Sequence, residues 1–381
     1  MSSIDTICTH EGDRPEDYLG SIGVPIFQTS LFSYKKKDSG YRYTRASNPT
    51  IENAEVKIAA LEEGESAACF SSGMGAISSS ILHFVKNGST VLVHRNVYGP
   101  AQYFLKYLKR FGVTTQFINS EKAIDFESAM GPQTALVYLE SPSTFLFKLL
   151  DIQGIAEAAR KRGIPVVVDN TWATPIYQKP LALGADLVVH SASKYLGGHS
   201  DIVAGVVVGK KELIQSIATE ERSNLGSNMD PHQAFLLIRG LRTLSVRMER
   251  HSKNAERVAN YLQTSPFVST VLWPGLPDRP DKTLVNKHLS GFSGVMSFIP
   301  TFDLSVVPQF LTTLKLFEVG PSWGGFESLA IAPGIFMDPK EMLELGIPPT
   351  LIRISVGLEN VEDIIQDLDQ ALKMAVQKGK I

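Results

Sequence analysis

The chain has 381 residues, of which 43% are hydrophobic, and its 37 basic and 39 acidic residues leave a formal net charge of −2. This near balance of acidic and basic residues argues against nucleic-acid or membrane-surface partners. No apolar run approaches the ~20 residues that a membrane-spanning helix needs. The only two cysteines, Cys8 and Cys69, have neither metal-ligand nor disulfide-framework spacing. The N-terminus lacks a signal-peptide pattern, so we expect a cytoplasmic protein.

The first 50 residues carry few periodic elements, and we expect them to form an extended arm. From residue 51 onward, helical and strand patterns alternate, which is typical of a parallel sheet with helices on both faces. Strands are expected at residues 90–93, 134–139, 165–168, 187–189 and 203–208. Helices are expected at residues 51–61, 101–110 and 155–162, among others.

A basic, helix-compatible stretch at 236–262 leads into a smaller α+β region, with a strand at 294–299 and a helix at 361–374. Because one domain usually spans about 100–200 residues, a chain of this length predicts two cores. We therefore predict an arm at 1–50, a large domain at 51–240 and a C-terminal domain at 241–381.

Two of the predicted strands stop abruptly on polar side chains. Residues 166–168 are all valine and are followed by Asp169, while residues 187–189 are followed by His-Ser-Ala-Ser and Lys194. In an open parallel sheet, ligands bind beyond the C-terminal ends of the strands. A carboxylate, an amine and two hydroxyls meeting there match pyridoxal 5'-phosphate (PLP), which needs a Schiff-base lysine and an acidic partner for its ring nitrogen.

Both residues also have ordinary interpretations. A lysine at a strand end is usually solvated, but the sequence around Lys194 is apolar and glycine-rich, and desolvation favours the uncharged amine that forms a Schiff base. Aspartate after a strand is most often a loop residue or a helix cap. The specific role that PLP needs is a carboxylate that keeps the pyridine nitrogen protonated, and Asp169 is the candidate.

The segment Ser71-Ser72-Gly73-Met74-Gly75 opens a helix that is expected to reach about residue 84, and the free N–H groups of a helix start favour phosphate. The segment nearly fits a dinucleotide fingerprint. However, a serine replaces the third glycine, and the preceding residues 66–70 are poor in β-branched side chains, so we reject dinucleotide binding.

Tyr98 follows a predicted strand after a short loop, and its ring could stack on a cofactor or pack at an interface. The sequence contains no metalloprotease, serine-hydrolase or P-loop motif. His190 and His199 lack a neighbour at metal-ligand spacing, so no metal is expected.

In these motifs the sequence resembles the PLP-dependent enzymes of cysteine and methionine metabolism, which include cystathionine β-lyase, cystathionine γ-lyase, cystathionine γ-synthase and methionine γ-lyase. The resemblance runs from Tyr43-Thr44-Arg45 to residues 353–358. It implies the PLP-dependent transferase fold type I, with a mostly parallel central sheet flanked by helices and a smaller C-terminal α+β domain. It also implies a homotetramer built from dimers that share active sites.

The resemblance further implies roles for individual residues. Lys194 and Tyr98 would be catalytic, with Lys194 as the Schiff-base lysine, Tyr98 stacking on the cofactor and Asp169 pairing with its ring nitrogen. The phosphate would be held by Gly73, Met74, Ser191 and Ser193, and Tyr43 and Arg45 would reach across a subunit interface to the neighbour's phosphate. The substrate would be bound by Ser322, Trp323 and Arg353, with the arginine on the α-carboxylate.

Several positions favour the β-lyase branch of the family. Trp323 stands where the γ-enzymes mostly carry leucine, Pro100 where methionine γ-lyases carry a cysteine, and Pro321 where γ-lyases often carry glutamate. Thr144 replaces a family asparagine at a position where bacterial β-lyases also depart. The arm, by contrast, is closer to the γ-enzyme version, and Arg42 would suit a distal carboxylate, although a solvated charge explains it equally.

We therefore expect a carbon–sulfur lyase of transsulfuration and methionine biosynthesis, acting on cystathionine or a related cysteine thioether by α,β-elimination to pyruvate, ammonia and a thiol. γ-Elimination or γ-replacement in the same fold stays open, as does amino transfer. The alternative from another class is an α/β binding protein that has kept the fold without catalysis.

Overall fold

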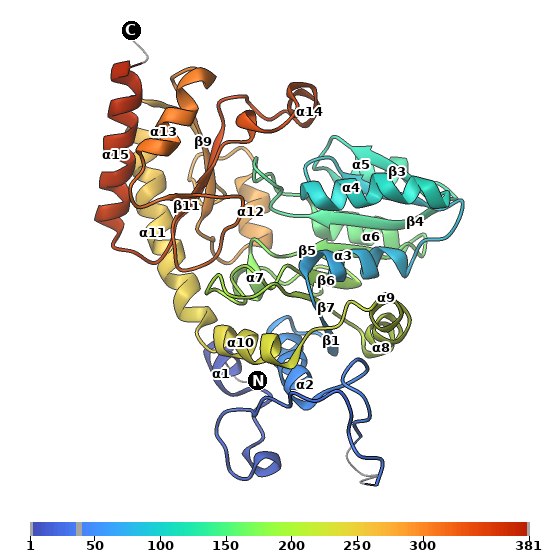
Figure 1. Cartoon of the computed structure of the whole chain (residues 1–381). Coiled ribbons are helices and arrows are strands. Elements are labelled where there is room, and N and C mark those ends of the chain that lie inside the picture. The colour runs from blue at the N-terminus through green and yellow to red at the C-terminus, as the bar shows by residue number, and fades with distance from the viewer. Residues whose placement is uncertain (1–2, 36–39, 379–381) are drawn as a thin grey trace. The chain divides into compact units, whose positions relative to one another are not determined.

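The computed structural model describes residues 3–35 and 40–378 (Figure 1). The chain forms two compact units: Met1–Ser141 with Leu150–Ser245, and Pro142–Leu149 with Val246–Ile381. Within the described ranges, no helix combines the length and the apolarity needed to cross a bilayer.

The first unit contains a seven-stranded sheet in the order β1-β7-β6-β5-β4-β2-β3. Its strands are β1 (Ser66–Phe70), β2 (Thr90–His94), β3 (Thr114–Ile118), β4 (Thr134–Glu140), β5 (Val166–Asp169), β6 (Leu187–His190) and β7 (Gly205–Gly209). Strands β3, β2, β4, β5 and β6 run parallel, whereas β7 is antiparallel to β6 and β1 is antiparallel to β7. The mostly parallel sheet that the sequence predicts is confirmed.

Helices cover both faces of this sheet (Figure 1). Successive residues of a strand point to opposite faces, so Val91 and Val93 pack with α3 (Gly73–Leu82), α4 (Gly99–Leu108) and α8 (Lys211–Ile217). Leu92, between them, packs on the other face with α5 (Ala123–Ala129) and α6 (Ile152–Arg160). Because both faces are buried, the central strands read as nearly continuous apolar runs.

The remaining helical elements of the first unit are α1 (Ile4–His10), α2 (Pro49–Leu61), α7 (Thr174–Tyr177), α9 (Ser223–Leu225), α10 (Pro231–Leu241), the 3₁₀ turns η1 (Pro15–Tyr18) and η3 (Lys109–Phe111), and the π-helical turn η4 (Ala218–Arg222). Helix α1 lies within the segment that we expected to be extended. It packs against α2 and buries Cys8 completely. The start of the arm is therefore part of the first unit's fold.

The helix-compatible stretch at 236–262 is helical except for residues 242 and 243, and two helices share it. Helix α10 begins at Pro231 with a capping box formed by Asp230 and Gln233, and α11 (Leu244–Thr264) follows after a two-residue turn. In that turn, Thr243 Oγ1 donates to the carbonyl of Gly240 over 3.2 Å. A serine or threonine hydroxyl that bonds to the backbone in this way competes with helix continuation.

The second unit contains a five-stranded sheet in the order β10-β11-β12-β9-β8. Its strands are β8 (Val268–Leu272), β9 (Val295–Pro300), β10 (Glu318–Val319), β11 (Leu329–Ile331) and β12 (Ile352–Ser355). Its helical elements, besides α11, are α12 (Lys282–His288), α13 (Val307–Thr313), α14 (Pro339–Leu345), α15 (Val361–Lys378), η5 (Leu304–Val306) and η6 (Pro333–Ile335). All pairs in this sheet are antiparallel except β10 with β11.

The short segment Pro142–Leu149 belongs to the second unit although it follows β4 in the chain. Leu146 packs in one apolar cluster with Met342, Ile347 and Leu351. The second unit is thus built from two separate pieces of sequence.

Candidate functional site

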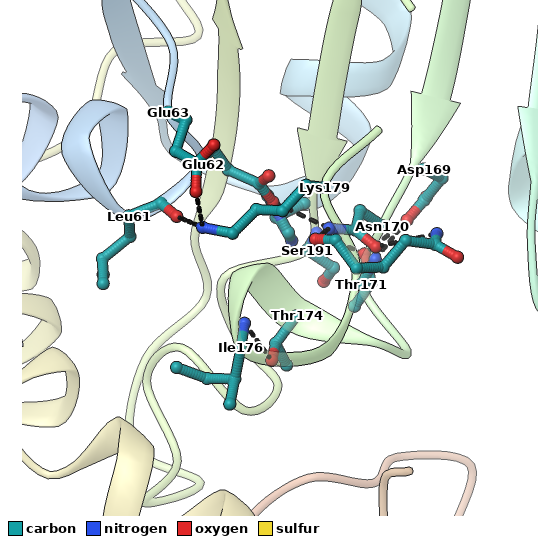
Figure 2. Close-up of polar contacts among 12 residues, drawn as sticks. Leu61, Glu62, Glu63, Asp169, Asn170, Thr171, Thr174, Ile176, Lys179 and Ser191 are labelled. Carbon is teal, nitrogen blue, oxygen red and sulfur yellow. Dashed lines mark hydrogen bonds and ion pairs between the residues drawn. The ribbon is translucent and has the colours of Figure 1, made fainter. Parts of the chain in front are cut away.

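Asp169 is the last residue of β5, and its side chain is only 6% exposed. Its Oδ1 accepts hydrogen bonds from the backbone N–H of Thr171 (3.0 Å) and from Thr171 Oγ1 (2.5 Å). On the neighbouring strand β4, the hydroxyl of Tyr138 donates to Oδ2 over 3.4 Å. The carboxylate is therefore held in one orientation at the C-terminal end of the sheet (Figure 2).

The surroundings of Asp169 shift its own pKa and that of Tyr138. Burial raises the pKa of Asp169, while the hydrogen bonds from Thr171, the charge of His190 and the hydrogen bond from Tyr138 lower it. Burial, followed by the negative charge of Asp169, raises the pKa of Tyr138 well above its usual range, so Tyr138 stays a donor. A desolvated carboxylate of this kind binds an N–H group strongly.

The residues that follow β6 form a turn that carries Lys194. The N–H of Lys194 donates to the carbonyl of Ser191 (3.1 Å), and the N–H of Gly198 donates to the carbonyl of Lys194 (2.7 Å). Ser193 Oγ accepts from the N–H of Ala204 over 2.9 Å, which fixes the turn to the segment before β7. The lysine amine is thus presented from a backbone that is hydrogen-bonded on both sides.

Thr171 connects the two strand ends, and the sequence analysis missed it. Its Oγ1 donates to Asp169 and accepts from the backbone N–H of Ser191 over 2.9 Å (Figure 2). The parallel pairing of β5 and β6 brings these residues together. The only local signal was a hydroxyl two residues after the aspartate, a common pattern in turns.

The N-terminus of α3 lies against Ser191. A Cβ placed on Gly73 would lie 2.8 Å from Ser191 Oγ, so only glycine fits here without a shift. Ser72 caps the helix by accepting from the N–H of Gly75 over 3.0 Å, and Met74 packs on the edge of the sheet core. Helix N–H groups beside a hydroxyl suit a phosphate.

These residues fit PLP. The first unit supplies a helix N-terminus close to a hydroxyl at Gly73 and Ser191, a desolvated carboxylate at Asp169 and an amine at Lys194, from loops at the C-terminal edge of parallel strands.

Tyr98 precedes α4 and is 43% exposed. Its backbone N–H donates to Glu140 Oε2, at the end of β4, over 2.5 Å. Tyr43 and Arg45 lie together on the exposed arm, with the guanidinium 5.6 Å from the centre of the Tyr43 ring. Both line a pocket of about 320 Å³ that Asp230 also borders.

In the second unit, Arg353 on β12 is 9% exposed and lies against the loop that carries two other predicted site residues. It donates through Nη2 to the carbonyls of Pro321 (2.8 Å) and Ser322 (3.1 Å). These bonds fix the loop that continues into Trp323.

The aromatic ring beneath Arg353 was not predicted. The guanidinium lies 5.6 Å from the centre of the Phe145 ring, and Phe145 adopts a positive φ of 61°. A bulky residue in the left-handed region is uncommon and is typically held there by its surroundings. The signal in the sequence was the apolar run at 145–147, which is unusual for a surface loop after a strand.

Known proteins of one family match this sequence along nearly its whole length. Residues 5–373 match the family model described as "Cys/Met metabolism PLP-dependent enzyme". The chain is 39% identical to L-methionine gamma-lyase of Pseudomonas putida (97% of this chain and 96% of the relative). It is 40% identical to cystathionine gamma-lyase of Homo sapiens (97% and 93%) and 40% identical to cystathionine beta-lyase of Lactococcus lactis subsp. cremoris (98% and 100%).

The fold matches the crystal structure of metB from Corynebacterium glutamicum with a TM-score of 0.94 and 34% identity, over 98% of both chains. This likeness confirms fold type I. The chain therefore belongs to the Cys/Met metabolism PLP-dependent enzyme family, and PLP is its cofactor.

Proposed function

We propose that the protein is a carbon–sulfur lyase that cleaves cystathionine, or a related cysteine thioether, by α,β-elimination. Relatives named for β- and γ-chemistry match the chain equally well, at 39–40% identity. The choice of β-elimination therefore rests on the residues that favour the β-lyase branch, above all Trp323, which follows the two residues that Arg353 holds. In carrying tryptophan at this position, the chain resembles the β-lyases.

The proposed chemistry begins with removal of the Cα proton. PLP supplies an electron sink that stabilises the negative charge left on Cα. Lys194 Nζ takes the proton as general base, and Asp169 keeps the ring nitrogen protonated. The phosphate would be held by Gly73, Met74, Ser191 and Ser193, and this would orient the cofactor towards both side chains.

The thiolate at Cβ then leaves, with the electrons of the Cβ–S bond on sulfur. For cystathionine and one water, the balanced products are homocysteine, pyruvate and ammonia. Tyr98 lies at the start of α4, where its ring would stack on the cofactor.

Arg353 would bind the substrate's α-carboxylate. A guanidinium fork matches a carboxylate in two parallel hydrogen bonds, and the partly buried position of Arg353 strengthens that interaction. We further propose that the working form is a homo-oligomer, a tetramer of paired dimers, in which Tyr43 and Arg45 reach the neighbour's phosphate.

The test is to incubate the PLP-loaded protein with cystathionine and identify the keto acid and the thiol. We expect pyruvate and homocysteine in equal amounts, and no turnover by Lys194→Ala. 2-Oxobutyrate with cysteine would overturn β-elimination in favour of γ-elimination. A PLP-loaded protein that releases no keto acid from cystathionine or from other cysteine thioethers would overturn lyase activity altogether.

Trp323 can be tested against a matched change in the same loop. We expect Trp323→Leu to lower kcat/KM for pyruvate formation about tenfold, equivalent to about 1.4 kcal/mol. Phe326→Leu, at a side chain that is 54% exposed, should leave it unchanged. Equal effects of both substitutions would mean that the loop, and not Trp323, determines the rate.

A further inference from the structure

A fully buried histidine–glutamate pair lies behind Asp169. Glu62 follows the last residue of α2 and is 0% exposed, and His190 ends β6 and is 1% exposed. Their atoms Oε1 and Nε2 are 2.6 Å apart. Asn170 Nδ2 donates to the same glutamate oxygen over 2.8 Å, so Oε1 contacts both His190 and Asn170 (Figure 2).

Stability alone does not account for this pair. A buried ion pair contributes little, and apolar residues of similar size often serve as well or better. Glu62 also stands at the C-terminal end of a helix, where the helix dipole disfavours negative charge. Within the described part of the chain, Glu62 Oε2 and His190 Nδ1 are buried without a hydrogen-bond partner.

The structure stabilises Glu62 in this position nevertheless. Lys179 Nζ donates to the carbonyl of Leu61 and lies 3.3 Å from Glu63 Oε1, which places a positive charge at the end of α2 (Figure 2). Gln178 Nε2 donates to Asn170 Oδ1 over 3.1 Å and so fixes the amide that contacts Glu62.

The pair adjoins the proposed cofactor carboxylate. Asp169 pairs with Val189 across β5 and β6. His190 and Asn170 are the next residues along the chain, and the alternation of side chains along a strand places His190 on the face of the sheet opposite to Asp169. Asp169 itself accepts hydrogen bonds from Tyr138 on β4 and from Thr171. Of the groups around Asp169, His190 is the one whose charge opposes the effect of burial on its pKa.

We propose that the proton shared by His190 and Glu62 keeps Asp169 in its carboxylate form, and through it keeps the PLP ring nitrogen protonated. Both act as positioning residues. The reason is electrostatic: a positive imidazolium near a desolvated carboxylate favours the charged form, and the 2.6 Å contact with Glu62 gives that imidazolium the negative partner that a buried cation needs. This inference rests on the proposed role of Asp169.

The test reads the ring nitrogen directly. Holoenzymes without substrate are loaded with PLP labelled with ¹⁵N at the ring nitrogen, and the ¹⁵N chemical shift reports its protonation. His190→Gln keeps an N–H donor but removes the charge, and Glu62→Gln removes the carboxylate. His83→Gln is the matched control, because His83 pairs with Glu221 over 3.0 Å elsewhere in the same unit.

We expect a protonated nitrogen in the wild type and in His83→Gln, and a deprotonated one in Asp169→Asn. His190→Gln and Glu62→Gln should shift towards the deprotonated value at full PLP occupancy, with kcat about tenfold lower and KM little changed. Adding His190→Gln to Asp169→Asn should change nothing further, because both act through one carboxylate.

Two results would overturn the inference. A wild-type shift in PLP-loaded His190→Gln or Glu62→Gln would show that the pair does not act on the cofactor, and the second variant decides if the first does not bind PLP. An unchanged shift in Asp169→Asn would remove the role of Asp169 itself. Neither result depends on whether cystathionine is cleaved at the β or the γ side, so the lyase proposal is tested separately.

Discussion

Single side chains at the proposed site each serve two neighbours. Thr171 Oγ1 donates to Asp169 and accepts from the N–H of Ser191, so one hydroxyl orients the carboxylate and fixes the start of the Lys194 turn. Gly73 lies against the same serine. The proposed phosphate cradle and the proposed partner of the ring nitrogen are therefore linked by direct contacts, and a change at one is expected to disturb the other.

Gly73 offers a prediction with a matched control. Gly73 and Gly99 are both the first residue of a ten-residue helix, but a Cβ on Gly73 would lie 2.8 Å from Ser191 Oγ, whereas one on Gly99 would meet nothing within 4 Å. Overpacking costs about 1–3 kcal/mol. We expect Gly73→Ala to raise the Kd for PLP roughly 5- to 150-fold and Gly99→Ala to leave it unchanged. Absorbance titration with PLP measures both, and equal Kd values would contradict the cradle.

At the scale of elements, α11 fixes the strand that carries Arg353. His251, fully buried on α11, lies with Nδ1 2.8 Å from the carbonyl of Val356, just after β12. One turn further along, Asn254 Nδ2 donates to the carbonyls of Gly357 and Glu359, both over 3.0 Å. Buried polar side chains thus satisfy the backbone where β12 ends.

His251 makes this contact sensitive to pH. Burial, with a smaller effect from Arg247, lowers the pKa of His251 from 6.5 to about 4. Between these values the unfolded chain binds a proton that the folded chain does not, so stability is lost as the pH falls from about 6.5 to 4. The loss approaches 1.4 kcal/mol per pH unit, roughly 3 kcal/mol in all.

Urea unfolding at a series of pH values tests this. We expect the free energy of unfolding to fall less steeply between pH 6.5 and 4 in His251→Gln than in the wild type, although the variant is less stable at neutral pH. His232→Gln, at an exposed side chain on α10, should keep the wild-type slope. Parallel slopes for wild type and His251→Gln would show that another group causes the acid sensitivity.

The sequence predicted the strands that are buried on both faces. Strands β5 and β6 are buried on both faces and therefore appear as branched apolar runs. Strand β3 was missed because it lies at the edge of the sheet and begins with Thr-Thr-Gln, and β1 has no β-branched residue at all. Whether such a segment forms a strand depends on the neighbouring strands and not on its own composition.

The same distinction applies to the site. Asp169 ends β5 and Lys194 lies four residues after β6, so the strand pattern located both. Glu62 meets His190 across 128 residues of sequence, and nothing local connects the end of α2 with the end of β6. Contacts of this kind follow from the packing of the whole unit, which is why the sequence left His190 as an ordinary structural histidine.

For the whole molecule, the exposed apolar side chains of the arm are not explained by contacts within a single chain. Several large apolar side chains of the arm are exposed, namely Leu19, Ile22, Leu31, Tyr34 and Tyr43. Exposed apolar side chains that gather in one segment commonly mark an interaction surface. This supports the proposal that the arm contacts another copy of the chain.

If Arg45 serves the neighbour's phosphate, two inactive variants should restore one another. In a mixed dimer of Arg45→Ala and Lys194→Ala, one of the two sites combines an intact Lys194 with an intact Arg45. Random pairing makes half of the dimers mixed, so co-expression should recover about a quarter of the wild-type activity. Activity of the unselected co-expressed mixture, per mole of total subunit, measures this.

The control pairs Lys194→Ala with Asp169→Asn. Both side chains follow strands of the same sheet, so every site in that mixture lacks one of them, and no recovery is expected. Recovery in the Arg45 mixture alone would place Arg45 in the partner's site, because only a residue supplied from the other chain can complete a site whose own chain keeps Lys194 and Asp169. Activity no higher than the sum of the separate variants would instead mean that each chain builds its phosphate site alone, and the exposed arm would then need another explanation.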